Sequence, residues 1–170
     1  MSRALNRPRV LVVYKRSTLE RYRAAHDARI KALLRAEDET VAKLVGAHDL
    51  HRKTIASTRA VLKALGTRAR FVHAHVPEPG ERWDLVVTLG GDGTLLWASH
   101  LVGSDVPMVA INSAPGSSVG YFCAGSTDDV EATLTRALEG DLRRTRLHRM
   151  QVEIDGRVVT KRVLNDVLFC

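Results

Sequence analysis

Cysteines, aromatic residues and long apolar runs are all scarce in this 170-residue sequence, and each shortage excludes a class of protein. The two cysteines, Cys123 and Cys170, have neither the spacing of a metal site nor enough partners for a disulfide framework. No stretch approaches the roughly 20 apolar residues that span a bilayer. The basic N-terminus lacks the apolar core of a secretory signal, so we expect a cytoplasmic protein with no membrane partner.

Aromatic residues make up only 5% of the chain, although its net charge of +7 would suit a nucleic acid. The sequence has no aromatic RNA-binding strand, zinc finger or basic-region helix, and its arginines are scattered. A nucleic-acid partner is therefore not favoured. A polyphosphate ligand, or simply an arginine-rich proteome, explains the positive charge equally well.

The most informative stretch is an apolar run, Val86–Leu89, that leads into Gly90-Gly91-Asp92-Gly93-Thr94. An amphipathic segment follows, so the order is strand, tight loop and helix N-terminus. Such a loop can bring backbone N–H groups up to a phosphate. A carboxylate at its centre would repel a phosphate, however. Asp92 is therefore a candidate for chemistry, for metal contact or for binding a hydroxyl.

Two further apolar runs, 10–13 and 107–111, predict buried parallel strands. The first is followed by Lys15 and Arg16, which could bind an anionic ligand. An equally supported alternative is that these two residues are the solvated start of the next helix. The second ends at Asn112 and a loop of small residues. If the strands are neighbours, this loop and the glycine loop flank one crevice. Residues 70–76 alternate and predict another strand.

Helices are predicted over 18–46, with a break near 37–40, and over 47–65, with Gly66 as a C-terminal cap. His48 and His51 lie three residues apart on the second of these segments. They could bind a metal, but no third ligand is nearby and a solvated helix face is favoured. His73 and His75 share one face of a predicted strand, where exposed edge positions are favoured over a zinc pair.

Two shorter helices are predicted after the glycine loop and after the small-residue loop. The first covers 95–102, with Trp97 in the core. In the second, Asp128 and Glu131 form an N-terminal capping pair and Gly140 ends the helix.

The pattern then becomes β-rich, with a hairpin turn at Asp155-Gly156 and strand-like residues over 163–170. Two or three strands cannot bury their own faces. We therefore expect a part of a longer protein, or a partner that completes the sheet.

Four motifs in this order resemble those of the NAD kinase family. They are Gly90-Gly91-Asp92-Gly93-Thr94-Leu95-Leu96, Pro107–Asn112, Gly116–Phe122 and Leu164-Asn165-Asp166-Val167. Residues 12–17 and 47–51 look like the divergent, mitochondrial-type branch. The resemblance implies an α/β fold, with a Rossmann-like open sheet domain over residues 1–125. Residues 126–170 would then hold a linking helix and the first strands of an incomplete all-β domain.

The resemblance also implies an activity, the transfer of the γ-phosphoryl group of ATP, or of polyphosphate, to the 2′-hydroxyl of the NAD adenosine ribose. Mg²⁺ would bridge the phosphates. Asp92 would be the general base or would orient the hydroxyl. Family members are commonly homo-oligomers, and the fragment alone is expected to be inactive. The other implied contacts are backbone approach to phosphate at Gly90, Gly91 and Gly93, a helix cap or phosphate contact by Thr94, loop support by Asn112, and adenosine contacts by Asn165 and Asp166.

Three departures from the family pattern leave alternatives open. Ala110 stands where glycine is usual, one extra residue separates Gly116 from Gly120, and Asp166 replaces glutamate. A lipid kinase of the diacylglycerol or sphingosine type shares the glycine motif but differs in the segments that follow it. A nucleotide-binding module that has lost catalysis is the other alternative.

Overall fold

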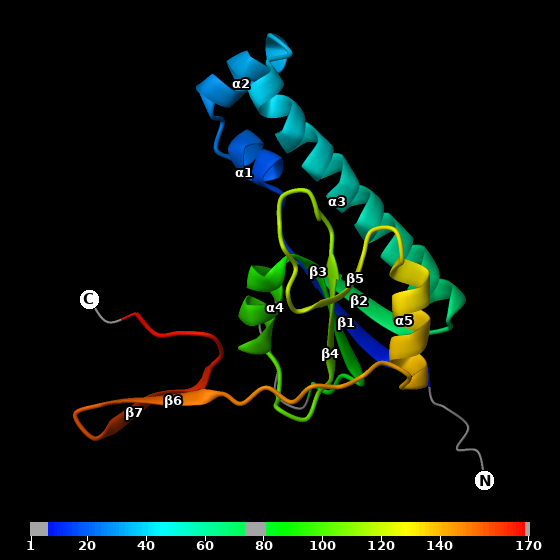
Figure 1. The fold of residues 1–170 in the computed structure, drawn as a ribbon, viewed down its shortest axis with the longest axis vertical. Helices are drawn as coiled ribbons and strands as arrows, with labels where there is room; N and C mark the ends of the chain where they lie inside the picture. Colours follow the sequence, from blue (N-terminus) through cyan, green and yellow to red (C-terminus); the bar gives the residue numbers. More distant parts are fainter. Residues whose placement is uncertain (1–6, 74–80, 169–170) are drawn as a thin grey trace.

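A five-stranded parallel sheet forms the centre of the molecule (Figure 1). The computed structural model describes residues 7–73 and 81–168. The order across the sheet is β2-β1-β3-β4-β5, which confirms the predicted open α/β sheet. Its strands are β1 (Arg9–Tyr14), β2 (Arg68–Val72), β3 (Leu85–Gly90), β4 (Met108–Asn112) and β5 (Cys123–Ser126).

The three inner strands are the continuous apolar runs of the sequence. Val12 of β1 pairs with Val87 of β3, and Leu89 of β3 pairs with Ile111 of β4. All four side chains are buried. Strands covered by helices on both faces need apolar residues at successive positions. These continuous runs therefore predict strands even though apolar and polar residues do not alternate in them.

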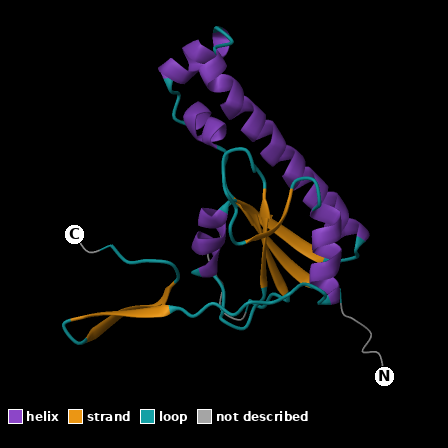
Figure 2. Cartoon of the chain, in the orientation of Figure 1, coloured by secondary structure: helices purple, strands orange, loops and turns teal. Residues whose placement is uncertain are grey.

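Helices cover both faces of the sheet (Figure 2). On one face lie α3 (Glu39–Ala64) and α5 (Val130–Glu139), and Leu62 and Leu134 pack there against the strands. On the other face lies α4 (Asp92–Ser99), which packs through Ala98. Two short helices, α1 (Thr18–Ala24) and α2 (Ala28–Arg35), lie beside the far end of α3, beyond the sheet (Figure 1).

The predicted helices 18–46 and 47–65 are divided differently in the structure. The predicted break near 37–40 is confirmed, since Glu37 has φ 51° and Asp38 caps the N-terminus of α3. A second break at His26, with φ 53°, was not predicted. The boundary near residue 46 is wrong because α3 is one continuous helix of 26 residues. Gly66, with φ 69°, ends it as expected.

Strand β5 was not predicted, because its four small residues, Cys123–Ser126, show no apolar alternation. The helix that follows has Asp129 at its N-cap, so the predicted capping pair of Asp128 and Glu131 is wrong. Gly140 ends it in the left-handed conformation, as predicted. Helix α5 begins after residue 125, where the domain boundary was expected, and it packs against α3 on the sheet.

The C-terminal part forms a separate antiparallel hairpin of β6 (Met150–Ile154) and β7 (Arg157–Val163) (Figure 1). Its turn is Asp155-Gly156, with φ 48° and 74°, as the sequence predicted. Residues 164–168 were expected to be strand-like but have no regular structure, and residues 169–170 lie outside the described part. Among the described residues, no helix is long and apolar enough to cross a membrane.

Candidate functional site

A crevice opens where two neighbouring strands send their chains to opposite faces of the sheet. After β1 the chain passes to α3 on one face, and after β3 it passes to α4 on the other. Ligands of open α/β sheets bind at such a switch point, beyond the carboxyl ends of the strands. The crevice has a volume of about 470 Å³ and is lined by Lys15, Gly91, Asp92, Gly93, Thr94, Trp97, Ser117 and Ser118.

The N-terminus of α4 faces this crevice without a side-chain cap. Gly90 is still the last residue of β3, Gly91 is the N-cap, and the helix begins at Asp92 itself. The predicted loop is thus a junction of one residue, Gly91. The N–H of Thr94 donates to the carbonyl of Gly91 at 2.9 Å. Because no side chain caps this end, the N–H groups that precede it in α4 and the positive end of the helix dipole are available to an anion.

Two of the three glycines are required by packing. A β-carbon on Gly90 would collide with the Thr94 side chain, and one on Gly91 would collide with Ser118. A β-carbon on Gly93 would meet nothing within 4 Å. The absent side chain of Gly93 therefore leaves room in the crevice. The Thr94 side chain lies against Gly90 and does not cap the helix, so that part of the Thr94 prediction is wrong.

The Asp92 carboxylate is held by two backbone donors of the small-residue loop. Its Oδ2 accepts a hydrogen bond from the N–H of Tyr121 at 2.9 Å, and its Oδ1 accepts one from the N–H of Phe122 at 2.8 Å. Each carboxylate oxygen has a second lone pair, so both can still accept a bond from a ligand. Asp92 is therefore oriented within the crevice while keeping free acceptor positions.

Asn112 shapes the loop that supplies those donors. Its Nδ2 donates to the carbonyl of Ser118 at 2.9 Å, and its Oδ1 accepts from the N–H of Ala114 at 3.1 Å. Strand β4 lies beside β3, with Asn112 opposite Gly90. The predictions that Asn112 supports the loop and that the two loops flank one crevice are both confirmed. A direct contact of Asn112 with a nucleotide stays a prediction.

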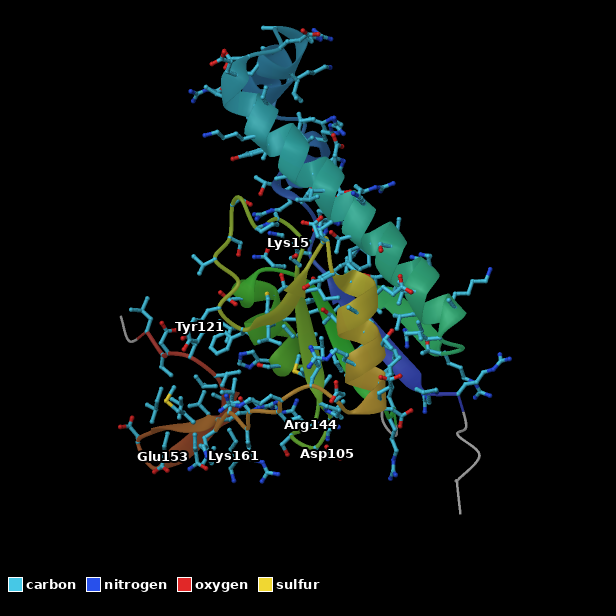
Figure 3. The ribbon with its side chains drawn as sticks, turned by 45° about the vertical axis from the view of Figure 1, so that its right-hand side comes forward. Lys15, Asp105, Tyr121, Arg144, Glu153 and Lys161 are labelled. Carbon is cyan, nitrogen blue, oxygen red and sulfur yellow. The ribbon has the colours of Figure 1, made fainter. Side chains whose placement is uncertain are left out.

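The two basic residues after β1 have different places. Lys15 lines the crevice, at the edge of the sheet where the loops emerge (Figure 3). Arg16 is not among the lining residues, and its guanidinium donates to Nε2 of His73 at 3.0 Å. Only Lys15 is therefore placed for an anion in this structure. His73 is exposed, as expected for an edge position, and His75 lies outside the described residues.

The expectation that His48 and His51 form a solvated helix face is wrong. His51 is only 2% exposed, with Nδ1 2.7 Å from Oγ of Ser113 and Nε2 2.8 Å from the carbonyl oxygen of Lys15. His48 is partly buried, with Nδ1 2.7 Å from Oγ of Ser17. Burial lowers the pKa of His51 and favours the neutral imidazole.

Sequence periodicity could have shown that His51 is buried. His51, Thr54, Thr58 and Leu62 follow one another at spacings of three and four on α3, and all are buried. Within the described residues, no group of three or more histidine, cysteine, aspartate or glutamate side chains could hold a metal ion.

Trp97 was expected in the core, but it is 41% exposed and lines the crevice. It lies four residues after Gly93 and hence on the same face of α4, a spacing that could have identified it. Cys123 lies nearby on β5. Burial, and then the charge of Asp92, raise the pKa of Cys123 to about 11, so its thiol stays protonated at neutral pH.

Asn165 and Asp166 are not brought to the crevice. Both are exposed in the irregular segment after β7, where Asn165 has φ 100°, and neither is among the lining residues. Their contacts with an adenosine group stay a prediction.

Comparison with known proteins gives a consistent result. Residues 6–142 match the family model described as the ATP-NAD kinase N-terminal domain. A probable NADH kinase of Oryza sativa subsp. japonica is 30% identical over 135 residues, which cover 70% of this chain and 42% of that protein. The mitochondrial NAD kinase 2 of Homo sapiens is 30% identical over 159 residues, covering 87% of this chain and 36% of that protein.

A solved structure and the lengths of the relatives complete the comparison. The crystal structure of an NAD kinase from Archaeoglobus fulgidus in complex with ATP aligns with 78% of this chain and 37% of its own, at 22% identity and a TM-score of 0.45. The chain spans less than half the length of the curated relatives named above.

Proposed function

This chain belongs to the ATP-NAD kinase family, and from that premise we propose that the whole protein transfers the γ-phosphoryl group of ATP to the 2′-hydroxyl of the NAD adenosine ribose. One observation carries the proposal. A single carboxylate, Asp92, is fixed at the uncapped N-terminus of α4 in a crevice that also contains Lys15. The crevice therefore combines an anion site with a proton acceptor, as phosphoryl transfer to a hydroxyl requires.

In the proposed reaction, the residues of the crevice have separate roles. The N–H groups at the start of α4 and the Lys15 ammonium bind phosphate oxygens. Asp92 accepts a hydrogen bond from the 2′-hydroxyl and takes its proton as the 2′-oxygen bonds to the γ-phosphorus. The bond from the γ-phosphorus to the bridging oxygen breaks, and ADP leaves with that oxygen. Asp92 then returns its proton to solvent.

The residues present fit a magnesium ion that enters with ATP. Mg²⁺ is usually held by one or two carboxylates together with substrate phosphates, and Asp92 supplies one carboxylate in the crevice. When bound, the ion neutralises charge on the transferring phosphoryl group. Thr94 also lines the crevice, with its side chain against Gly90.

Three further parts of the proposal concern the whole protein. Asn165 and Asp166 would contact the adenosine of NAD after a movement of the segment that follows β7. The protein would form a homo-oligomer and act in the cytoplasm. Light scattering of the full-length protein and fractionation of its cells would test these last two points.

The direct test incubates the full-length protein with ATP, Mg²⁺ and NAD and measures NADP with an NADP-specific dehydrogenase. Replacing Asp92→Asn should lower kcat at least about 100-fold, because a positioned proton acceptor contributes that much or more. The matched control is Asp105→Asn, which removes an exposed carboxylate at the opposite end of the sheet from Lys15 (Figure 3) and should leave kcat unchanged.

Each other outcome has a definite meaning. A folded full-length protein that forms no NADP would overturn the proposal. Phosphorylation of diacylglycerol in a parallel assay would identify a lipid kinase, and ATP binding without either product would identify a binding module. Full NADP formation by Asp92→Asn would contradict the role of this residue alone.

A further inference from the structure

Three consecutive residues after β1 are each held by a histidine. The carbonyl of Lys15 accepts a hydrogen bond from Nε2 of His51 at 2.8 Å. The guanidinium of Arg16 bonds to His73 at 3.0 Å, and the hydroxyl of Ser17 lies 2.7 Å from Nδ1 of His48. Of these three held residues, only Lys15 lines the crevice.

The position of His51 is the most constrained of the three. It is buried on α3 and connects Lys15, which follows β1, to Ser113, which follows β4. The N–H of Lys15 lies 3.4 Å from the carbonyl of Leu89, and the N–H of Ser113 lies 3.2 Å from the carbonyl of Gly90. His51 therefore joins the two strand ends that flank the end of β3, which lies two residues before Asp92.

The partners of His51 determine its tautomer. A backbone carbonyl can only accept, so Nε2 carries the hydrogen, and Nδ1 accepts from the Ser113 hydroxyl. Both ring nitrogens are thus used, and no polar atom of the buried ring lacks a partner. An imidazole so placed fixes the backbone of Lys15 directly.

We propose that His51 is a positioning residue for substrate binding, which fixes the Lys15 backbone so that its ammonium faces the phosphates of a nucleotide in the crevice. The identity of that nucleotide as ATP rests on the proposed function. Lysine has a flexible four-carbon stem, and a mobile backbone beneath it would raise the entropy lost when the ammonium binds an anion. His51 removes that freedom before the ligand arrives.

The test uses the full-length protein and measures the Kd of ATP with Mg²⁺ by titration calorimetry, together with KM and kcat for NADP formation. His51→Phe keeps the ring volume but loses both hydrogen bonds, and it should raise the Kd and KM for ATP about fivefold to tenfold, the size of one buried hydrogen bond. The value of kcat should change by less than about twofold, since the acceptor and Asp92 are untouched.

A conservative variant and a double mutant separate positioning from simple stabilisation. His51→Gln places an amide N–H near the position of Nε2 and should restore the Kd to within about twofold of the wild type. In a Lys15→Met background, His51→Phe should raise the Kd no further, because the residue through which His51 acts is absent.

Thr54→Val is the matched control. Thr54 is also buried on α3, but its hydroxyl lies 2.9 Å from that of Thr127 and donates to the carbonyl of Leu50 at 2.8 Å, so its hydrogen bonds are made to residues other than Lys15. This variant should lower the stability and leave the Kd of ATP unchanged.

The possible failures are distinguishable. An equal rise in the Kd for His51→Phe with and without Lys15, or an unchanged Kd in a folded His51→Phe protein, would overturn the inference. So would a folded wild-type protein that binds no ATP. A protein that binds ATP with the expected pattern but forms no NADP would overturn the proposed function and leave this inference standing.

Discussion

The α/β body and the β6–β7 hairpin bury their apolar residues to very different extents. In the body, the successive side chains of β1 from Val10 to Val13 are fully buried between helices. In the hairpin, Ile154 is 48% and Val159 is 61% exposed. Figure 3 shows Glu153 and Lys161 on a hairpin that lies apart from the body.

The difference shows which part of the chain is stabilised by its own packing. Each inner strand of the body has neighbours on both edges and helices on both faces. Each strand of the hairpin pairs with the other, and arginine side chains form hydrogen bonds between the hairpin region and the body. Arg149 donates to the carbonyl of Val102 at 3.4 Å, and Arg162 donates to that of His100 at 2.8 Å. A two-stranded hairpin is only marginally stable. The crevice is therefore built on the rigid part.

The largest expected contrast comes from matched truncations in the two regions. Leu62→Ala opens a cavity between α3 and the sheet, where Leu62 is fully buried, and should cost about 2 to 5 kcal/mol of unfolding free energy. Ile154→Ala in the exposed hairpin should cost only about 0.5 kcal/mol or less. Urea unfolding followed by circular dichroism measures both. Equal losses would show that the hairpin packs against something in solution.

A smaller contrast comes from two glycines with left-handed backbone. Gly120 has φ 68° and Gly156 has φ 74°, so alanine is strained at either position. A β-carbon on Gly120 would also collide with the Asn112 amide, whereas one on Gly156 would meet nothing within 4 Å. Gly156→Ala should cost about 1 to 2 kcal/mol.

Gly120→Ala should cost more, about 2 to 4 kcal/mol, because it also disturbs the two Asn112 hydrogen bonds that shape the loop. It should lower ATP affinity as well, since that loop supplies the donors to Asp92. Unfolding midpoints and ATP titration test this pair. A Gly120→Ala protein as stable as Gly156→Ala would show that Asn112 can move aside freely.

Local patterns in the sequence were sufficient for most of the body. Continuous apolar runs predict β1, β3 and β4, and glycines predict the ends of α3 and α5. The same logic placed Lys15 and Asp92 beyond neighbouring strands, and both line the crevice. These predictions succeed because strand burial and helix capping are determined by residues close together in the chain.

The errors involve contacts between distant residues. His51 is hydrogen-bonded to Ser113, which lies 62 residues away in the sequence, and the donors to Asp92 lie 29 and 30 residues away. Trp97 was expected in the core, but its side of α4 faces the crevice. Local spacing does indicate that His51 is buried and that Trp97 shares a face with Gly93. It does not show which distant residues they meet, because that depends on which strand ends become neighbours.

The smallest expected effect is the contribution of His51 to the pH dependence of the free energy of unfolding. Burial lowers the pKa of His51 below its ordinary value of 6.5, as does the nearby charge of Lys15 and of His48, while the Lys15 carbonyl and the Glu20 charge act in the opposite direction. The unfolded chain therefore binds a proton that the folded chain excludes. The stability that depends on a neutral His51 is complete above pH 6.5 and is lost as the pH falls through the lowered pKa. The free energy of unfolding should fall between pH 7.5 and 5.5, and His51→Gln should remove the part of that decrease that comes from His51.

His148→Gln, which changes an exposed histidine just before the hairpin, is the matched control and should leave the decrease unchanged. A wild-type profile identical to that of His51→Gln would show that His51 takes up its proton without loss in the folded body.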